Sequence, residues 1–362
     1  MAASAPLQAW PRRPSVAGVS TLRARPAVAN GRFPTTRARA FDALREIPGD
    51  ALRSWTFEER RANLAAALDE GNGLVIVRGL HDLTPAELVD ISRCVGPDVE
   101  RNPGVDPRYL VPDWPEVQVI GNVRDDAGEL RAMFSRAPPL PLDERGRPTL
   151  RYDPESRSPV WHTDQAFRDP PPFASLLYCV VAPPPSAGGH TAFADCTAAY
   201  ESLPETTRAS LADLRAVCSY AHHNAKVRLR TPTYPLLTPE QRAKHPPVYQ
   251  PVARVDPRTG RRSLYGFSSA VCAVVPEGTV LDDDAVDRHE LEGWEDPSVR
   301  ERMYGELLPK ATAEAFTRAH AWTPGDLVVW DNLRTIHAAT PFEGKHDREM
   351  WRTTVASRWE DA

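Results

Sequence analysis

Short apolar segments, each ended by glycine, proline or a polar cluster, are the feature that most constrains the fold of this chain. Six of them have the length and composition of buried β-strands: residues 74–77, 117–120, 175–181, 190–194, 327–330 and 353–356. The 362 residues include 37 prolines, and proline is poorly tolerated inside helices and central strands. Many short strands joined by proline-rich connections favour a mainly β fold over a helical bundle.

Helices are predicted as insertions between these strands. Residues 50–71 have helical character, and Thr84 should cap a second helix, with Pro85 in its first turn and Glu87 at the capping-box position. Further helical segments are expected at 197–214 and across most of 282–320. No internal repeat is present, so we expect one β-rich domain over residues 41–362 with helical decoration.

Two segments differ from this domain in composition. Residues 1–40 contain seven arginines, no lysine and no acidic residue, which predicts a basic N-terminal extension or an organellar transit peptide. Residues 133–160 are rich in Pro, Arg and Asp without periodicity. Because long irregular loops in compact domains often cover a site, we expect a lid here.

Composition excludes several classes of partner. The net charge of −5 provides no basic surface for nucleic acid, and no apolar run is long enough to span a bilayer. Five scattered cysteines without a CxxC pair indicate reduced thiols. We therefore expect a soluble, cytoplasmic protein that acts on a small molecule and can form homo-oligomers. If residues 1–40 are a transit peptide, the destination is a mitochondrion or chloroplast.

One motif offers metal ligands. In the stretch Trp161-His162-Thr163-Asp164, residues 162 and 164 would share one face of a strand. His337, predicted just past a strand end, could supply a second imidazole. Two histidines and one carboxylate form the facial triad of non-heme Fe(II) oxygenases. The competing interpretation is a histidine and an aspartate in a solvated turn.

An arginine follows this motif at a useful distance. An iron oxygenase that uses a keto diacid needs a cation for the far carboxylate, and guanidinium binds carboxylate in a bidentate manner. Arg348, eleven residues after His337, fits that role. Thr191, on another predicted strand, could donate its hydroxyl to the same carboxylate.

Several stretches occur in a recognisable order: 161–164 with Phe167, 188–191 with Phe193 and 198–201, 257–261 with 264–265, 324–327, 330–332 with His337, and then Arg348 and Arg352. The ordered set resembles the taurine dioxygenase-like family of Fe(II)/2-oxoglutarate-dependent oxygenases, which includes the 2,4-dichlorophenoxyacetate dioxygenases. The resemblance implies a double-stranded β-helix, a cupin-like jelly-roll barrel with iron at one mouth. It implies iron ligation by His162, Asp164 and His337.

The same resemblance implies the activity. Arg348 and Thr191 would bind 2-oxoglutarate, whose decarboxylation to succinate and CO2 with O2 drives hydroxylation of an unactivated C–H bond. Arg352 would bind an anionic or amino-acid-like substrate, and Trp161 and Phe167 would line its pocket or belong to the core. The taurine enzymes also use a histidine upstream of the metal motif, which is absent here between residues 96 and 161. That absence argues against taurine.

Other outcomes remain open. The same chemistry could give desaturation or cyclisation in a natural-product pathway, whereas halogenation is disfavoured because related halogenases lack the carboxylate found here at Asp164. A non-oxidative cupin-like metal-binding protein is a further alternative. An oxygenase acting on protein or chromatin is not supported, since the chain shows neither zinc modules nor a basic surface. The adjacent His222 and His223 would point to opposite faces of a strand, so no second metal site is expected.

Overall fold

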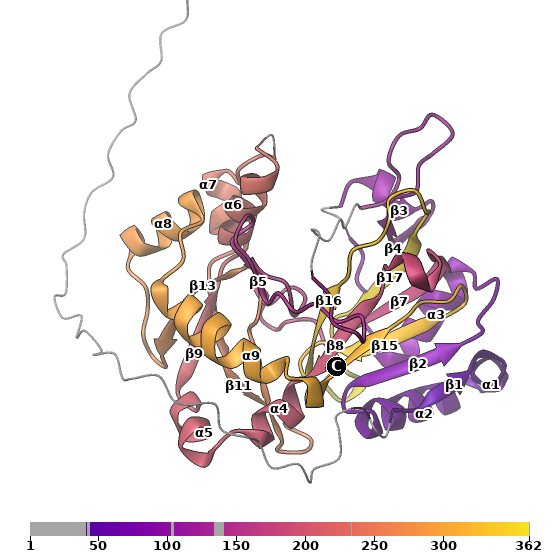
Figure 1. Cartoon of the computed structure of the whole chain (residues 1–362), viewed down its shortest axis with the longest axis horizontal. Coiled ribbons are helices and arrows are strands. Elements are labelled where there is room, and N and C mark those ends of the chain that lie inside the picture. The colour runs from indigo at the N-terminus through magenta and orange to yellow at the C-terminus, as the bar shows by residue number, and fades with distance from the viewer. Residues whose placement is uncertain (1–40, 42–43, 103–104, 134–140, 233, 362) are drawn as a thin grey trace, which may run out of the picture. The chain divides into compact units, whose positions relative to one another are not determined.

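Two β-sheets organise the part of the chain that the computed structural model describes, residues 41, 44–102, 105–133, 141–232 and 234–361 (Figure 1). The larger sheet has the order β1 (Glu46–Pro48), β2 (Leu74–Arg78), β15 (Leu327–Asp331), β7 (Ala174–Val181), β17 (Glu349–Val355), β4 (Trp114–Gly121) and β3 (Leu110–Val111). The smaller has the order β14 (Thr317–His320), β8 (Thr191–Asp195) and β16 (Thr335–Ala339). The predicted N-terminal extension, residues 1–40, lies outside the described residues.

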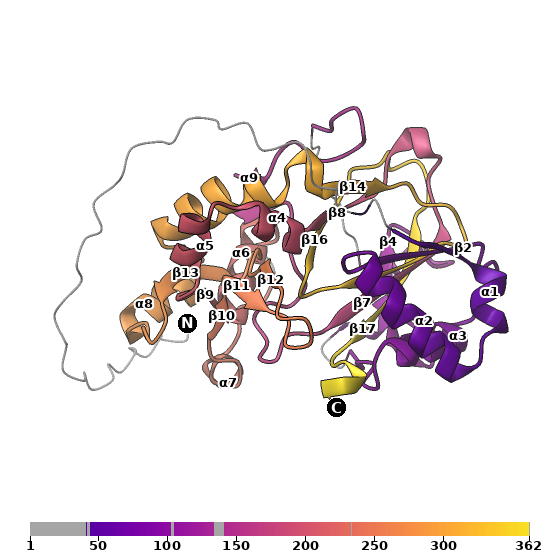
Figure 2. The same cartoon turned by 90° about the horizontal axis from the view of Figure 1, so that it is seen from below.

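Side-chain alternation buries both faces of the larger sheet. Val75 and Val77 of β2 pack with α2 (Phe57–Glu70) and α3 (Pro85–Val95) in one apolar cluster, and these helices cover that face in Figure 2. The intervening Leu74 and Ile76 enter a second cluster together with Phe193 of β8. The second cluster therefore joins the two sheets.

The far face of the smaller sheet packs on a long insertion. Ala192 and Ala194 of β8 belong to the apolar cluster that this insertion forms. Its elements are α4 (Cys196–Ser202), α5 (Glu205–Leu211), β9 (Leu214–Cys218), α6 (Tyr220–Arg230), α7 (Pro239–Ala243), β10 (Val248–Pro251), β11 (Ala253–Val255), β12 (Arg262–Leu264), β13 (Val271–Pro276), α8 (Asp283–Glu292), a π-helical segment (Val299–Leu307) and α9 (Leu308–Ala311). A mainly β chain with helical insertions is thus confirmed.

Local signals located most element ends. Thr84 and Glu87 form the predicted capping box of α3. The helix expected over residues 50–71 is instead divided into α1 (Gly49–Ser54) and α2, because Thr56 caps α2 through a capping box of its own. All five cysteines are buried free thiols. Among the described residues, no helix is long and apolar enough to cross a membrane.

One segment prediction was wrong. Residues 222–230 belong to helix α6 rather than to the strand assumed for His222 and His223. The helical segments expected over 197–214 and most of 282–320 are confirmed, although Leu214 opens β9 and residues 317–320 form β14 against β8. In these places pairing or packing with distant residues selects the conformation.

The described part of the predicted lid, residues 141–160, is anchored to the insertion. Two short strands, β5 (Tyr152–Asp153) and β6 (Ser158–Pro159), interrupt an otherwise irregular course. Arg151 Nε donates to Thr312 Oγ1 (2.8 Å), and Tyr152 Oη donates to Glu295 Oε1 (2.8 Å). Glu295 also pairs with Lys226 Nζ at 2.6 Å, and both side chains are 1% exposed. A buried ion pair therefore lies beneath this segment.

Removing one partner of that pair should be costly. Lys226→Ala leaves the buried Glu295 carboxylate paired with Arg300 (2.7 Å), so we expect the free energy of unfolding to fall by about 3 kcal/mol, the low end of the cost of breaking a buried pair. Denaturant titration would measure the loss. Lys345→Ala is a matched control, because its pair with Glu343 is exposed and should be worth less than about 1 kcal/mol. Equal losses in the two variants would contradict the interpretation.

Candidate metal centre

Three side chains with metal-ligand chemistry meet between the sheets. The ligand atoms of His162, Asp164 and His337 all lie within 4.8 Å of one another. Asp164 Oδ1 is 3.9 Å from Nε2 of each histidine, and the two imidazole centroids are 4.4 Å apart. Two imidazoles and one carboxylate match the donor set that non-heme iron takes. The structure thus brings together the three ligands expected from the sequence.

The backbone places the two histidines opposite each other. His162 N donates to His337 O and His337 N donates to His162 O, each at 2.9 Å, forming an isolated antiparallel bridge. His337 follows the end of β15, as predicted, but it lies within a further strand, β16. Its strand partner is Phe193 of β8, so His337 points toward the space between the sheets.

The stretch 162–164 is a bridge residue followed by a turn, not the strand that we predicted. Asn332 holds this turn at the end of β15. Its Oδ1 accepts from Asp164 N (2.8 Å), and its Nδ2 donates to Asp164 O (2.9 Å). Thr163 Oγ1 donates to Asn332 O (2.7 Å). Asn332 belongs to the predicted stretch 330–332, but no separate role was expected for it.

Burial and neighbouring charges keep Asp164 and His337 deprotonated. Burial opposes the charge of Asp164, but His337, Arg352 and His162 outweigh it and lower the pKa of Asp164 to about 2. Asp164 Oδ2 accepts from Ser175 Oγ (3.1 Å), which leaves Oδ1 toward the histidines. Burial and the neighbouring His162 lower the pKa of His337 to about 3. Near neutral pH, Asp164 is a carboxylate and His337 a neutral imidazole, the forms that bind metal.

A buried cation, Arg348, directly precedes strand β17. Arg348 is 6% exposed, and burial lowers the pKa of its guanidinium to about 10. No carboxylate among the described residues forms an ion pair with it. Its Cζ lies 6.0 Å from the centroid of the Phe342 ring. An unpaired buried guanidinium is unfavourable alone and favourable with an anion, so this side chain suits a carboxylate ligand.

The strand β17 and its neighbours position both predicted arginines. Arg348, Met350 and Arg352 occupy alternate positions, and Met350 packs in the cluster between the sheets. Asn122 fixes the backbone of Arg348, because its Oδ1 accepts from Arg348 N (2.7 Å) and its N donates to Arg348 O (3.1 Å). Gly121 is required here, since a Cβ would lie 1.8 Å from Arg348 O.

The remaining predicted residues lie at different depths. Thr191, 3% exposed, opens β8 on the same face as Phe193. Arg352 Nη2 donates to Gln118 Oε1 (2.7 Å), and its Nη1 is 3.8 Å from Asp164 Oδ1. Trp161 is 1% exposed and belongs to the core cluster of the insertion. The structure therefore places Arg352 beside the ligands and Trp161 in the core.

Phe167 contacts an aromatic group that the sequence analysis missed. Its ring lies 4.9 Å from Tyr220 and 6.2 Å from His223, both on α6. Burial, with the charges of Lys226 and His162, lowers the pKa of His223 to about 4, so His223 is neutral near pH 7. His222 instead is buried against His289 O (2.8 Å). Had residues 220–230 been predicted as a helix, the different surroundings of His222 and His223 would have been expected.

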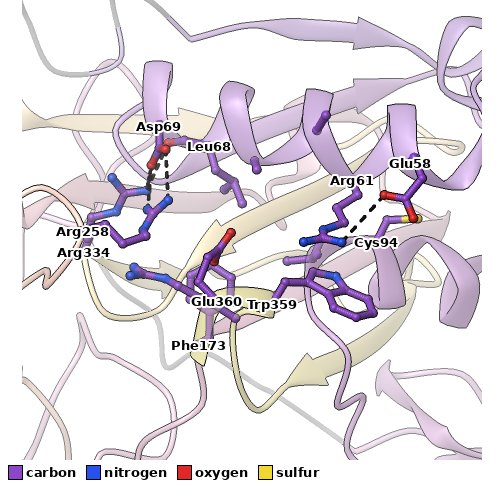
Figure 3. Close-up of a pocket in the computed structure, with 14 residues that line it drawn as sticks. Glu58, Arg61, Leu68, Asp69, Cys94, Phe173, Arg258, Arg334, Trp359 and Glu360 are labelled. Carbon is purple, nitrogen blue, oxygen red and sulfur yellow. Dashed lines mark hydrogen bonds and ion pairs between the residues drawn. The ribbon is translucent and has the colours of Figure 1, made fainter. Parts of the chain in front are cut away.

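The cavity at the C-terminal end of the chain is separate from this centre. It measures about 380 Å³ and is lined by α2, the end of α3 and the segment 358–360 (Figure 3). Arg258 and Arg334 both pair with Asp69 across it. Arg334 also pairs with Asp331 (2.8 Å), so this arginine is structural. None of the residues predicted for the metal centre lines the cavity.

Comparison with known proteins finds a family whose sequence model matches this chain. The model of the taurine catabolism dioxygenase TauD, TfdA family matches residues 33–354. An alpha-ketoglutarate-dependent 2,4-dichlorophenoxyacetate dioxygenase from a Burkholderia species is 34% identical over 55% of this chain, and the match spans 58% of that enzyme. Pentalenolactone F synthase from Streptomyces avermitilis is 30% identical over 88% of this chain and 94% of its own length.

Solved structures agree with the family match. A taurine dioxygenase from Burkholderia xenovorans aligns with a TM-score of 0.59 at 25% identity, covering 90% of each chain. Its likeness therefore extends well beyond the metal motif. With the family model matching most of the chain, the conclusion is direct: this chain belongs to the taurine catabolism dioxygenase TauD, TfdA family.

Proposed function

We propose that the protein is an Fe(II)/2-oxoglutarate-dependent dioxygenase that hydroxylates a small anionic or amino-acid-like substrate. One observation carries the proposal: the donor atoms of His162, Asp164 and His337 converge. The buried Arg348, which forms no ion pair with a carboxylate of the described residues, adds a cation suited to the co-substrate. Family membership supports it. We further propose that the two facing sheets form a double-stranded β-helix, as in the jelly-roll fold expected from the sequence.

In this proposal the side chains have separate tasks. His162, Asp164 and His337 hold Fe(II), which supplies the redox chemistry that couples O2 and 2-oxoglutarate to substrate oxidation. Ser175 and Asn332 keep the Asp164 carboxylate aimed at the ion. Arg348 binds the far carboxylate of 2-oxoglutarate in a bidentate manner, with Thr191 as a second donor. Fixing that carboxylate orients the keto-acid end toward the metal.

The substrate class rests on Arg352 and its surroundings. Its guanidinium lies 3.8 Å from Asp164 Oδ1 and is 21% exposed, so it can bind an anion beside the metal. Phe167, Tyr220 and the neutral His223 offer an aromatic wall. Residues 133–160 would act as the lid, and Tyr152 and Arg151 anchor its described part to the insertion. These features favour an anionic compound with an apolar body.

A second outcome of the same chemistry has specific support. The match to pentalenolactone F synthase extends over 88% of this chain. Desaturation or ring closure in a natural-product pathway would use the same ligands and co-substrate and differ only in the product. Hydroxylation adds one oxygen atom to the substrate, whereas desaturation removes two hydrogen atoms and releases water. Product mass therefore separates the two.

A succinate-release screen tests the proposal. The enzyme is incubated with Fe(II), 2-oxoglutarate, O2 and panels of phenoxy acids, sulfonates, amino acids and betaines. We expect one class to raise succinate release well above the uncoupled rate. Anaerobically, Fe(II) and 2-oxoglutarate should give the weak visible charge-transfer band of the chelate. A folded protein that binds Fe(II) without the band and without succinate would be the non-oxidative cupin-like alternative.

A further inference from the structure

One hydrogen bond links the predicted co-substrate clamp to a residue outside it. Trp322, two residues beyond β14, is 4% exposed and packs in the cluster between the sheets. Its Nε1 donates to Thr191 Oγ1 at 3.0 Å. A buried indole N–H needs an acceptor, and here that acceptor is the hydroxyl expected to bind 2-oxoglutarate.

This bond determines how the hydroxyl can be used. A tryptophan N–H only donates, whereas a threonine hydroxyl has one hydrogen and two lone pairs. With one lone pair facing Trp322, the Thr191 hydrogen must point away from the indole. Within the part of the chain that the structure describes, no group accepts a hydrogen bond from Thr191 Oγ1. The Thr191 hydroxyl is therefore oriented as a hydrogen-bond donor, and its hydrogen has no acceptor among the described residues.

The fold directs this hydroxyl and Arg348 toward the same region. Phe342 forms a backbone bridge with Gly188, three residues before Thr191, and its ring is the one beneath the Arg348 guanidinium. Thr191 shares its side of β8 with Phe193, which belongs to the same cluster as Trp322 and Met350. A carboxylate bound by Arg348 would meet the Thr191 hydrogen there.

We propose that Trp322 is a positioning residue for the co-substrate: it orients the Thr191 hydroxyl as a donor to the far carboxylate of 2-oxoglutarate. The inference rests on the proposed function, because it requires a keto diacid in the site. Trp322 itself does not touch the ligand. Its indole sets the direction in which the Thr191 hydroxyl donates its hydrogen bond.

Anaerobic titration of the Fe(II) protein, read from the charge-transfer band, tests this role. Trp322→Phe keeps an apolar ring and removes the N–H, so we expect the Kd for 2-oxoglutarate to rise about 3- to 10-fold, the value of one neutral hydrogen bond. The Kd for 2-oxobutanoate, which has the keto-acid end without the far carboxylate, should not change. Adding Trp322→Phe to Thr191→Val should raise the Kd no further than Thr191→Val alone.

Controls separate this role from packing and from the proposed function. Trp330→Phe removes similar volume from the same cluster, but the Trp330 Nε1 has no hydrogen-bond partner, so the affinity ratio of the two keto acids should stay at the wild-type value. Equal weakening of both ligands by Trp322→Phe, or no weakening, would overturn the inference. A wild-type protein that gives no band with Fe(II) and 2-oxoglutarate would instead overturn the proposed function.

Discussion

Replacing His337 with alanine should abolish succinate release, lowering it by more than about 100-fold, because losing a direct ligand exceeds the 10- to 100-fold cost of losing its supporting groups. The variant should also fail to retain Fe(II) after desalting, as metal analysis would record. The backbone bridge to His162 does not use the imidazole, so the variant should still fold.

His81→Ala provides the matched control, since it removes an exposed imidazole just beyond β2, outside the candidate centre. It should keep both iron and turnover. If His337→Ala retained iron and released succinate at the wild-type rate while folded, the assignment of His337 to the metal would be wrong. Circular dichroism melts of both variants show whether they are folded.

Arg348→Leu should weaken 2-oxoglutarate binding by about 100-fold or more, since removing one member of a buried, hydrogen-bonded charge pair costs about 2–5 kcal/mol. The far carboxylate would then be buried without a cation. Anaerobic titration measures the Kd. Affinity for 2-oxobutanoate should change little, because that ligand brings no far carboxylate to the guanidinium.

Two further variants sharpen this test. Arg348→Lys keeps a charge but not the planar fork, so we expect a Kd between those of the wild type and the leucine variant. Arg101→Leu removes a guanidinium that is 73% exposed and should leave the Kd unchanged. A leucine variant that bound both keto acids as the wild type does would remove Arg348 from the co-substrate site.

Local sequence signals predicted those elements whose conformation their own residues determine. The apolar run 74–77 became β2, and Thr84 with Glu87 capped α3 as expected. Residues 317–320 lacked such signals, because they are extended only through pairing with β8. The long charged region before them favoured helix. Strands at the edge of a small sheet depend on partners far away in the chain, which local patterns do not specify.

The metal centre was predictable in composition but not in construction. His162, Asp164 and His337 could be chosen from their types and order, and the structure brings them together. The strand expected for 162–164 is instead a turn held by Asn332. His223 was missed because a strand was assumed, whereas on α6 successive side chains point in different directions. Its position near Phe167 depends on how the insertion packs.

The reciprocal backbone bridge between His162 and His337 has a consequence for metal exchange. Because main-chain hydrogen bonds fix the spacing of these two residues, an ion bound by their imidazoles would cost little conformational entropy, and the pair would keep its spacing when the ion leaves. A site of this kind would be filled and emptied without refolding. Its occupancy would then follow the concentration of available metal rather than the history of the chain's synthesis.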